Sequence, residues 1–158
     1  MTPDQHRQRA AEIAVEEAAL GFRNFDFERA WKIGHRLVEV AGDRPLAIRI
    51  VLAGRTLFSA ALDGSSDDNR LWLDRKLATV ARFGHSSLWL HHNLRARGRS
   101  LADVSGIGPN GGPTGGLDVA DHGGGVPIRI GAQVVGAVAV SGLAHEEDHR
   151  ITMEAMRA

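Results

Sequence analysis

The chain has 158 residues, of which 19 are basic and 19 acidic, and it contains no cysteine. The zero net charge argues against a dedicated binder of nucleic acid or of an anionic membrane, because both attract a surplus of lysine and arginine. The lack of cysteine excludes disulfides, thiolate catalysis and iron–sulfur clusters.

The length predicts one domain over residues 1–158, in which residues 1–22 form an N-terminal helical extension. The first residues do not resemble a signal peptide, and no apolar run approaches the roughly 20 residues that span a bilayer. We therefore expect a cytoplasmic protein without a membrane or nucleic-acid partner.

The N-terminal third is predicted to be helical. Residues 5–20 are rich in alanine and glutamate, which favour helix. A second helix is predicted to begin at Asp26, a good N-cap, because apolar residues recur at helical spacing after it. Gly42 and Pro45 end that helix.

The middle of the chain predicts a hairpin followed by two helices. Residues 46–53 have the composition of a strand, Gly54 and Arg55 form a tight turn, and residues 56–61 form the partner strand. Helices are predicted over residues 67–83 and 86–97. His91 and His92 are expected on the surface of the second of these.

The C-terminal third begins with a loop over residues 105–125, where nine glycines fall within 21 positions. Within this loop we predict a short strand at Leu117–Ala120. Strands over residues 126–130 and 133–140 and a helix over residues 145–157 follow. The order α-α-β-β-α-α-(β)-β-β-α predicts an α+β fold with a mainly antiparallel sheet of about five strands, flanked by helices.

Two short motifs indicate chemistry that the surrounding residues do not favour. His145 to His149 match H-E-x-x-H, in which two histidines share a helical face and bind zinc. The middle positions here are both acidic, which instead suits the positive end of a helix dipole. Residues 106–111 match G-x-G-x-x-G, but glycine and proline follow where a nucleotide-binding motif needs a helix. Ser86, after His85, is expected to cap a helix.

A dispersed set of polar residues is a better candidate for ligand binding. The glycines after His122 would let the backbone approach a ligand closely, and histidine and arginine suit a propionate, a phosphate or a bound metal. The alternative is a hydrogen-bonded structural role for the histidines and a solvated face for the basic helix. The predicted ligand-binding residues are Arg75, Lys76, Arg82, His85, His122, Gly123, Gly124, Asp148 and His149.

Several of these residues belong to motifs whose order and spacing resemble the haem-degrading-domain family of GlcG-type and HbpS-type proteins. The resemblance covers nearly the whole chain and is strongest to a short, single-domain branch of uncharacterised proteins. The motifs that carry it are Asp68-Asn69, Trp72-x-x-Arg75-Lys76, Arg82-Phe83-Gly84-His85-Ser86-Ser87, His122-Gly123-Gly124-x-Val126-Pro127-Ile128, Val138-x-Val140-Ser141-Gly142-Leu143 and Glu146-Glu147-Asp148-His149.

This resemblance implies an antiparallel sheet flanked by helices, a homo-oligomer, and in some relatives the binding of haem or a corrinoid. It makes His85, His122 and His149 candidate axial ligands of a haem iron. We assign no other metal ligand. Trp72, Phe83 and Trp89 could line an apolar slot for the macrocycle. The chain departs from the family over residues 105–116, which are unusually rich in glycine and proline.

Three functions therefore stay open. The first is a domain that binds haem or another tetrapyrrole, with or without degrading it, and whose redox chemistry is supplied by the cofactor. The second is a non-catalytic homo-oligomeric scaffold or binding module, favoured by the lack of a compact acid, base and nucleophile set. The third is a small-molecule enzyme with an anion pocket formed by Lys76, Arg82, His85 and His122. Whether the chain is an enzyme is left open.

Overall fold

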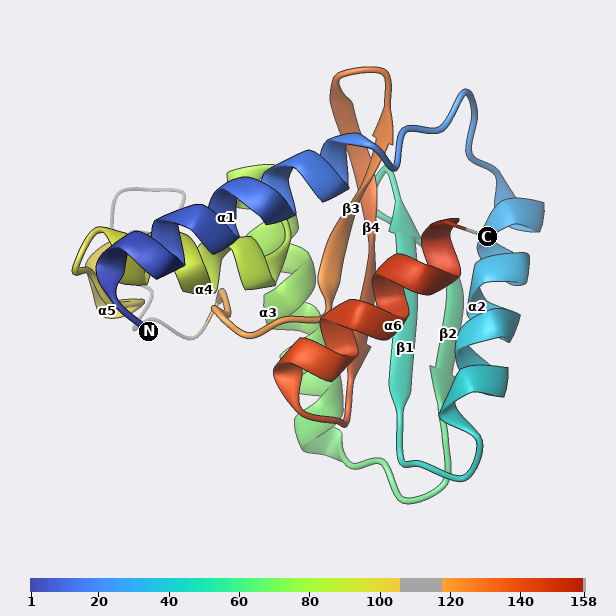
Figure 1. The fold of residues 1–158 in the computed structure, drawn as a ribbon. Coiled ribbons are helices and arrows are strands. Elements are labelled where there is room, and N and C mark those ends of the chain that lie inside the picture. The colour runs from blue at the N-terminus through green and yellow to red at the C-terminus, as the bar shows by residue number, and fades with distance from the viewer. Residues whose placement is uncertain (106–117, 158) are drawn as a thin grey trace.

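The computed structural model describes residues 1–105 and 118–157 (Figure 1). The predicted helices and hairpins are present, with one additional short helix before the glycine-rich loop. The helices are α1 (Pro3–Ala18), α2 (Phe27–Ala41), α3 (Asp67–Phe83), α4 (Ser87–Ala96), α5 (Ala102–Ser105) and α6 (His145–Arg157). The strands are β1 (Ala47–Leu52), β2 (Arg55–Ala61), β3 (Gly125–Ile130) and β4 (Gln133–Ser141).

The strands form one four-stranded antiparallel sheet with the order β2-β1-β4-β3. Two hairpins supply the outer pairs, and the β1–β4 pair joins them in the middle. The α+β class is therefore confirmed, whereas the expectation of about five strands and the predicted element order are slightly wrong.

The missing fifth strand was predicted at Leu117–Ala120, of which residue 117 lies outside the described part. Val119 and Ala120 are buried, but they are not part of the sheet. The hydroxyl of Thr79 on α3 takes the place of a strand partner: it accepts from the N–H of Ala120 at 2.9 Å and donates to its carbonyl at 2.8 Å. A side chain thus satisfies the buried backbone groups that a sheet would otherwise satisfy.

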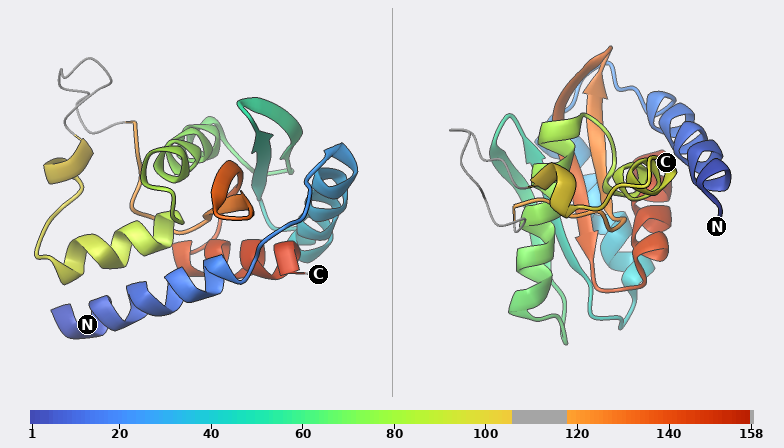
Figure 2. Two further views of the ribbon diagram at one scale, coloured as in Figure 1. Left: turned by 90° about the horizontal axis from the view of Figure 1, so that it is seen from above. Right: turned by 90° about the vertical axis from the view of Figure 1, so that its left-hand side faces the viewer.

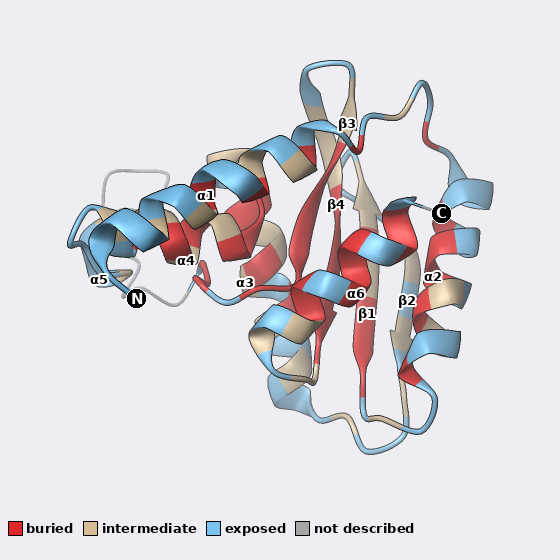
Figure 3. Ribbon diagram, in the orientation of Figure 1, coloured by how far each residue is buried: buried red, intermediate tan, exposed pale blue. Residues whose placement is uncertain are grey.

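The helices lie in layers on the sheet. α2 and α6 cover one face and α3 covers the other, while α1 lies along α4 beside the sheet (Figure 2). The central strands are buried and the outer surfaces of the helices are exposed (Figure 3). No helix in residues 1–105 or 118–157 is long and apolar enough to cross a membrane.

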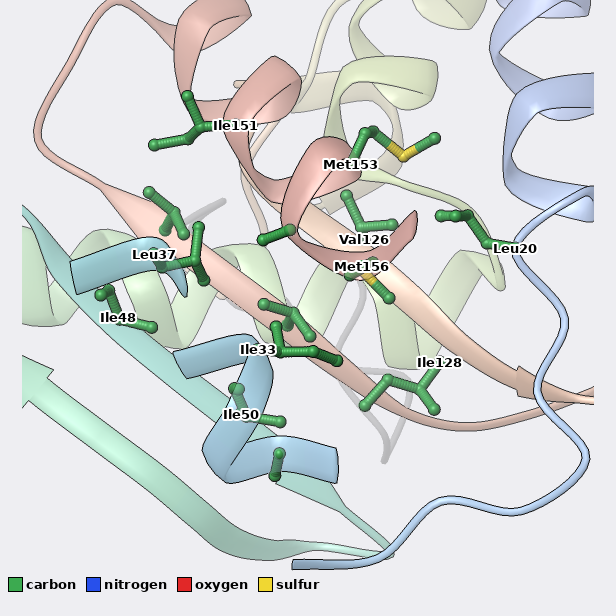
Figure 4. Packing of buried hydrophobic residues seen from close by; sticks show 14 of the residues in the cluster. Leu20, Ile33, Leu37, Ile48, Ile50, Val126, Ile128, Ile151, Met153 and Met156 are labelled. Atoms are coloured by element: carbon green, nitrogen blue, oxygen red, sulfur yellow. The ribbon is translucent and has the colours of Figure 1, made fainter. Parts of the chain in front are cut away.

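The main core fills the space between the sheet and helices α2 and α6 (Figure 4). Ile33 and Leu37 of α2 pack on Ile48 and Ile50 of β1, and all four are fully buried. α2 can approach this closely because of Gly34. A Cβ atom there would lie 2.5 Å from the Phe58 ring of β2.

The predicted helix caps are confirmed where the structure describes them. The Asp26 carboxylate accepts from the N–H of Arg29 at 2.9 Å, and the Ser86 hydroxyl accepts from the N–H of Trp89 at 3.1 Å. Each cap satisfies a backbone donor that has no partner within its helix.

Helix α1 is bonded to the rest of the domain by a buried carboxylate. Glu17 accepts from the N–H of Ser86 at 2.7 Å and from Nδ1 of His85 at 2.9 Å, and Arg129 of β3 lies 3.6 Å away. A carboxylate at 1% exposure needs such partners, because burying an unpaired charge is costly.

Candidate functional site

The strongest candidate site is a cleft of about 280 Å³ where α3, the segment before β3 and the start of α6 meet. We call it the His122 cleft. It is lined by Asn69, Trp72, Lys76, His122, Ser141, Gly142, Leu143, His145 and Asp148. Three of the predicted ligand-binding residues, from three separate parts of the chain, therefore meet there.

His122 is the most accessible histidine of this cleft, with 48% of its side chain exposed. Its Nδ1 lies 3.3 Å from the Asp121 carboxylate. The pKa of Asp121 is well below its usual range, because His122 and then Arg95 hydrogen-bond to the carboxylate. An anionic partner at Nδ1 orients the imidazole and leaves Nε2 as the nitrogen that can meet a ligand.

Lys76 and Asp148 form a buried ion pair at the base of the cleft, with their side chains 3% and 2% exposed. The Lys76 ammonium donates to the carbonyl of Val140 at 2.9 Å and to Asp148 at 3.3 Å, while the N–H of Leu143 donates to the other Asp148 oxygen. Burial raises the pKa of Asp148 to about 6 and lowers the pKa of Lys76, since desolvation opposes both charges.

The two predicted glycines bring the backbone against this pair. A Cβ atom on Gly123 would lie 2.3 Å from the carbonyl oxygen of His145, and one on Gly124 would lie 2.3 Å from that of Val140 and 2.9 Å from the Lys76 ammonium. Gly124 also has a φ of +132°, which favours glycine. The glycines are thus required by close packing around Lys76.

His145 lines the cleft, and its ring centroid lies 4.8 Å from that of His91. The His145 Nδ1 accepts from the N–H of Gly123 at 3.2 Å, whereas the His91 Nδ1 bonds to the carbonyl of Asp121 at 3.0 Å and must donate. Burial lowers the pKa of His145 and lowers that of His91 to about 4. Both rings are therefore neutral near pH 7, with opposite tautomers.

Sequence reasoning missed His91, and it was wrong about His92. His92 on α4 is 1% exposed, and its Nδ1 lies 2.8 Å from that of His6 on α1. The helical pattern of α4 could have shown this, because Leu88 and His92 are four residues apart and occupy one buried face.

The other predicted residues lie around the cleft or away from it. The Arg75 guanidinium lies 5.2 Å from the Trp72 ring centroid, beside the cleft. Arg82 instead donates to the carbonyl of Val104 at 2.5 Å. His85 is bonded to Glu17 and stacks on Trp89, with ring centroids 4.0 Å apart.

The proposed anion pocket of Lys76, Arg82, His85 and His122 is therefore divided between two places. Arg82 lies six residues after Lys76, which is about 9 Å farther along the helix. Phe83 and Trp89 line a separate pocket, away from Trp72.

His149 on α6 is buried and does not line the cleft. It is 3% exposed, and neither ring nitrogen has a hydrogen-bond partner in the described part of the chain. Burial lowers its pKa to about 4. The H-E-x-x-H motif does begin α6, but no three His, Asp or Glu side chains among residues 1–105 and 118–157 are placed to hold a metal ion.

Comparison with known proteins agrees with this fold and with the motifs. Residues 25–157 match the model of the family described as "Haem degrading protein HbpS-like". A UPF0303 protein of Streptomyces coelicolor is 42% identical over 149 residues, covering 92% of this chain and 90% of that protein. A UPF0303 protein of Acidobacterium capsulatum is 40% identical, covering 92% and 86%.

Solved structures share the arrangement of helices and strands. The Ybr137w protein has a TM-score of 0.80 at 26% identity, over 93% of this chain and 84% of that one. HbpS has a TM-score of 0.64 at 22% identity, over 84% and 87%. A PduOC:heme complex has a TM-score of 0.69 at 18% identity, over 84% and 93%. The last two show the fold alone.

The family match spans most of the chain, and the relatives cover it almost from end to end at 40% identity or more. This chain belongs to the haem-degrading HbpS-like family, among its UPF0303 members.

Proposed function

We propose that this protein binds haem or a related tetrapyrrole at the His122 cleft, with Nε2 of His122 as the axial ligand. The observation that carries the proposal is the half-exposed His122 ring, whose Nδ1 faces the Asp121 carboxylate. A carboxylate beside the other ring nitrogen fixes the tautomer of a metal-binding imidazole and makes it a stronger ligand.

The surrounding residues fit such a group. The Trp72 ring centroid lies 4.9 Å from that of His122 and offers an apolar surface to a macrocycle. Arg75, which contacts Trp72, and Arg95, which donates to Asp121, are candidate partners for propionates. The cleft, of about 280 Å³, is slightly smaller than the roughly 300–1,000 Å³ of ordinary ligand pockets, so a macrocycle bound there would be only partly enclosed.

The family description and the PduOC:heme complex among the structural relatives support a tetrapyrrole ligand. Bound haem supplies the iron chemistry, and haem degradation also needs oxygen and a source of electrons. The protein's own part is to orient His122 through Asp121 and to hold the glycine turn beneath it through Lys76.

The test is a haem titration of the purified protein, followed at the Soret band. We expect saturable one-to-one binding, a changed spectrum or no binding for His122→Ala, and affinity about tenfold lower for Asp121→Asn. His35→Ala removes an exposed histidine on α2 and is the matched control.

Two results would contradict this proposal. One is an absence of saturable binding, and the other is an unchanged spectrum and affinity in His122→Ala. A change in His85→Ala alone would move the axial ligand to the second predicted histidine. Loss of the Soret band over time, on addition of ascorbate in air, would support degradation.

We also propose that the chain forms a homo-oligomer, because an apolar surface lies beside an unpaired strand edge. Phe27 and Trp31 on α2 are 56% and 46% exposed, and Trp31 contacts Phe58 of the edge strand β2. Exposed aromatic residues beside an open sheet edge are typical of interfaces. Light scattering is expected to show a multiple of 17.0 kDa that Trp31→Lys reduces. A monomeric native protein would overturn this.

A further inference from the structure

The connection between α1 and α2 carries a second cleft, which has a different chemistry from the His122 cleft. It has a volume of about 470 Å³ and lies between residues 19–24, the start of α2 and the end of α6. Its charged lining consists of Arg23, Arg29 and Arg157, and no acidic side chain lines it within the described chain. We call it the arginine cleft.

The three arginines are exposed, and none has a carboxylate partner among residues 1–105 and 118–157. Elsewhere in the molecule arginines pair with acids: Arg49 with Asp74, and Arg150 with Glu147. Asp26 lies between Arg23 and Arg29 in the sequence, but its carboxylate caps α2 and does not line the cleft. In a chain with no net charge, three unpaired guanidinium groups are a strong local excess of positive charge.

The backbone of the connection adds further donors. The N–H of Phe22 is bonded to the carbonyl of Arg129, which fixes the path of the segment against β3. The next two N–H groups, of Arg23 and Asn24, have no hydrogen-bond acceptor within the described protein. Backbone amides next to guanidinium groups are typical of sites for phosphate and carboxylate oxygens.

Part of the remaining lining is apolar, and Asn24 adds a polar side chain to it. Leu20, Phe22 and Met156 line it, and the Arg29 guanidinium lies 5.6 Å from the Phe22 ring centroid. A ligand that fits must therefore present two or more negative charges to the arginines, whereas a non-polar part is an optional addition that this surface accommodates.

We propose that the arginine cleft binds a small organic polyanion, either a phosphate ester or a di- or tricarboxylate. Arginine recognises both groups through paired N–H donors, so the shared chemistry is a planar or tetrahedral set of anionic oxygens. This site is separate from the His122 cleft and does not depend on haem binding.

Calorimetric titration at constant ionic strength tests the proposal, with pyrophosphate and citrate as the probes. We expect saturable binding of at least one of them, and preference between the two identifies the phosphate or the carboxylate class. The double variant Arg23→Gln/Arg157→Gln is expected to weaken that binding by about tenfold or more, because it removes two charged donors.

The matched control is Arg97→Gln, which removes an exposed arginine at the far end of α4. Unchanged binding in this control supports the assignment. The proposal is overturned if neither probe binds saturably, or if Arg97→Gln weakens binding as much as the double variant does. Circular dichroism checks that the variants are folded. A haem titration of the same variants, run in parallel, tests haem binding at the His122 cleft separately. Failure of anion binding and failure of the proposed haem binding are therefore distinguishable.

Discussion

At the scale of single residues, we expect the largest loss in the free energy of unfolding when one partner of the Lys76–Asp148 pair is removed. Both charges are almost fully removed from water. Besides pairing with each other, Lys76 donates to the carbonyl of Val140, and Asp148 accepts from the N–H of Leu143. A pair of this kind need not add much net stability, but removing one partner leaves an uncompensated charge in the interior.

We therefore expect Lys76→Met to lower the free energy of unfolding by about 3–5 kcal/mol at pH 7. The pKa of Asp148 is already raised to about 6, so the folded protein binds a proton more readily than the unfolded chain. Without Lys76 this pKa rises further, and protonation on acidification relieves the buried charge. Urea unfolding should show a smaller loss, relative to the native protein, at pH 5 than at pH 7. An equal loss at both pH values would contradict the explanation.

The glycine at position 124 should tolerate no side chain. Gly124→Ala places a Cβ atom against the Val140 carbonyl and the Lys76 ammonium at a φ of +132°. We expect a loss of about 2 kcal/mol or more in thermal or chemical unfolding. Gly21→Ala is the control, because a Cβ atom there meets nothing within 4 Å. Equal effects of the two substitutions would refute the close-packing argument.

At the scale of elements, histidines are concentrated where α1, α4 and α6 meet. Burial lowers the pKa values of His91, His92 and His149 to about 4. Unfolded histidine titrates near 6.5, so the unfolded chain binds more protons than the folded protein between about pH 6.5 and 4. Stability should therefore fall as the pH decreases through this window, and these helix contacts should weaken first.

His149 offers the sharpest test of this acid sensitivity. Both of its ring nitrogens are buried and have no hydrogen-bond partner among the described residues, so His149→Leu removes an unsatisfied polar group as well as a titrating one. We expect the variant to be more stable by about 1–3 kcal/mol at pH 5 and to lose less stability on acidification. A steeper slope in His149→Leu would contradict the prediction.

At the scale of the whole molecule, one sheet and its two helical layers bring the cleft residues together. A ligand of the His122 cleft bridges α3, the β3 approach and α6, so it should stabilise the domain as a unit. At a hundredfold excess over the dissociation constant, haem is expected to add about 2.7 kcal/mol to the free energy of unfolding. Thermal unfolding of the native protein should shift upward with haem, while His122→Ala should not respond.

Local features of the fold followed from the sequence because they depend on neighbouring residues. The Asp26 and Ser86 caps, the hairpin at Gly54 and the bounds of α3 each rest on contacts within a few positions. The family motifs likewise placed His122, Lys76 and Asp148 among the site candidates. The G-x-G-x-x-G match at residues 106–111 lies outside the described residues, as does residue 158.

Only the tertiary structure decided which candidates meet. Lys76 and Asp148 are 72 positions apart, and they pair because β4 runs between α3 and α6 in the middle of the sheet. The same packing separates Arg82 and His85 from the cleft and buries His92. Local sequence signals report helix, strand and cap, since these depend on short-range backbone geometry. Burial, ion pairing and the shape of a cleft depend on which distant surfaces pack together, and no spacing within the chain encodes that directly.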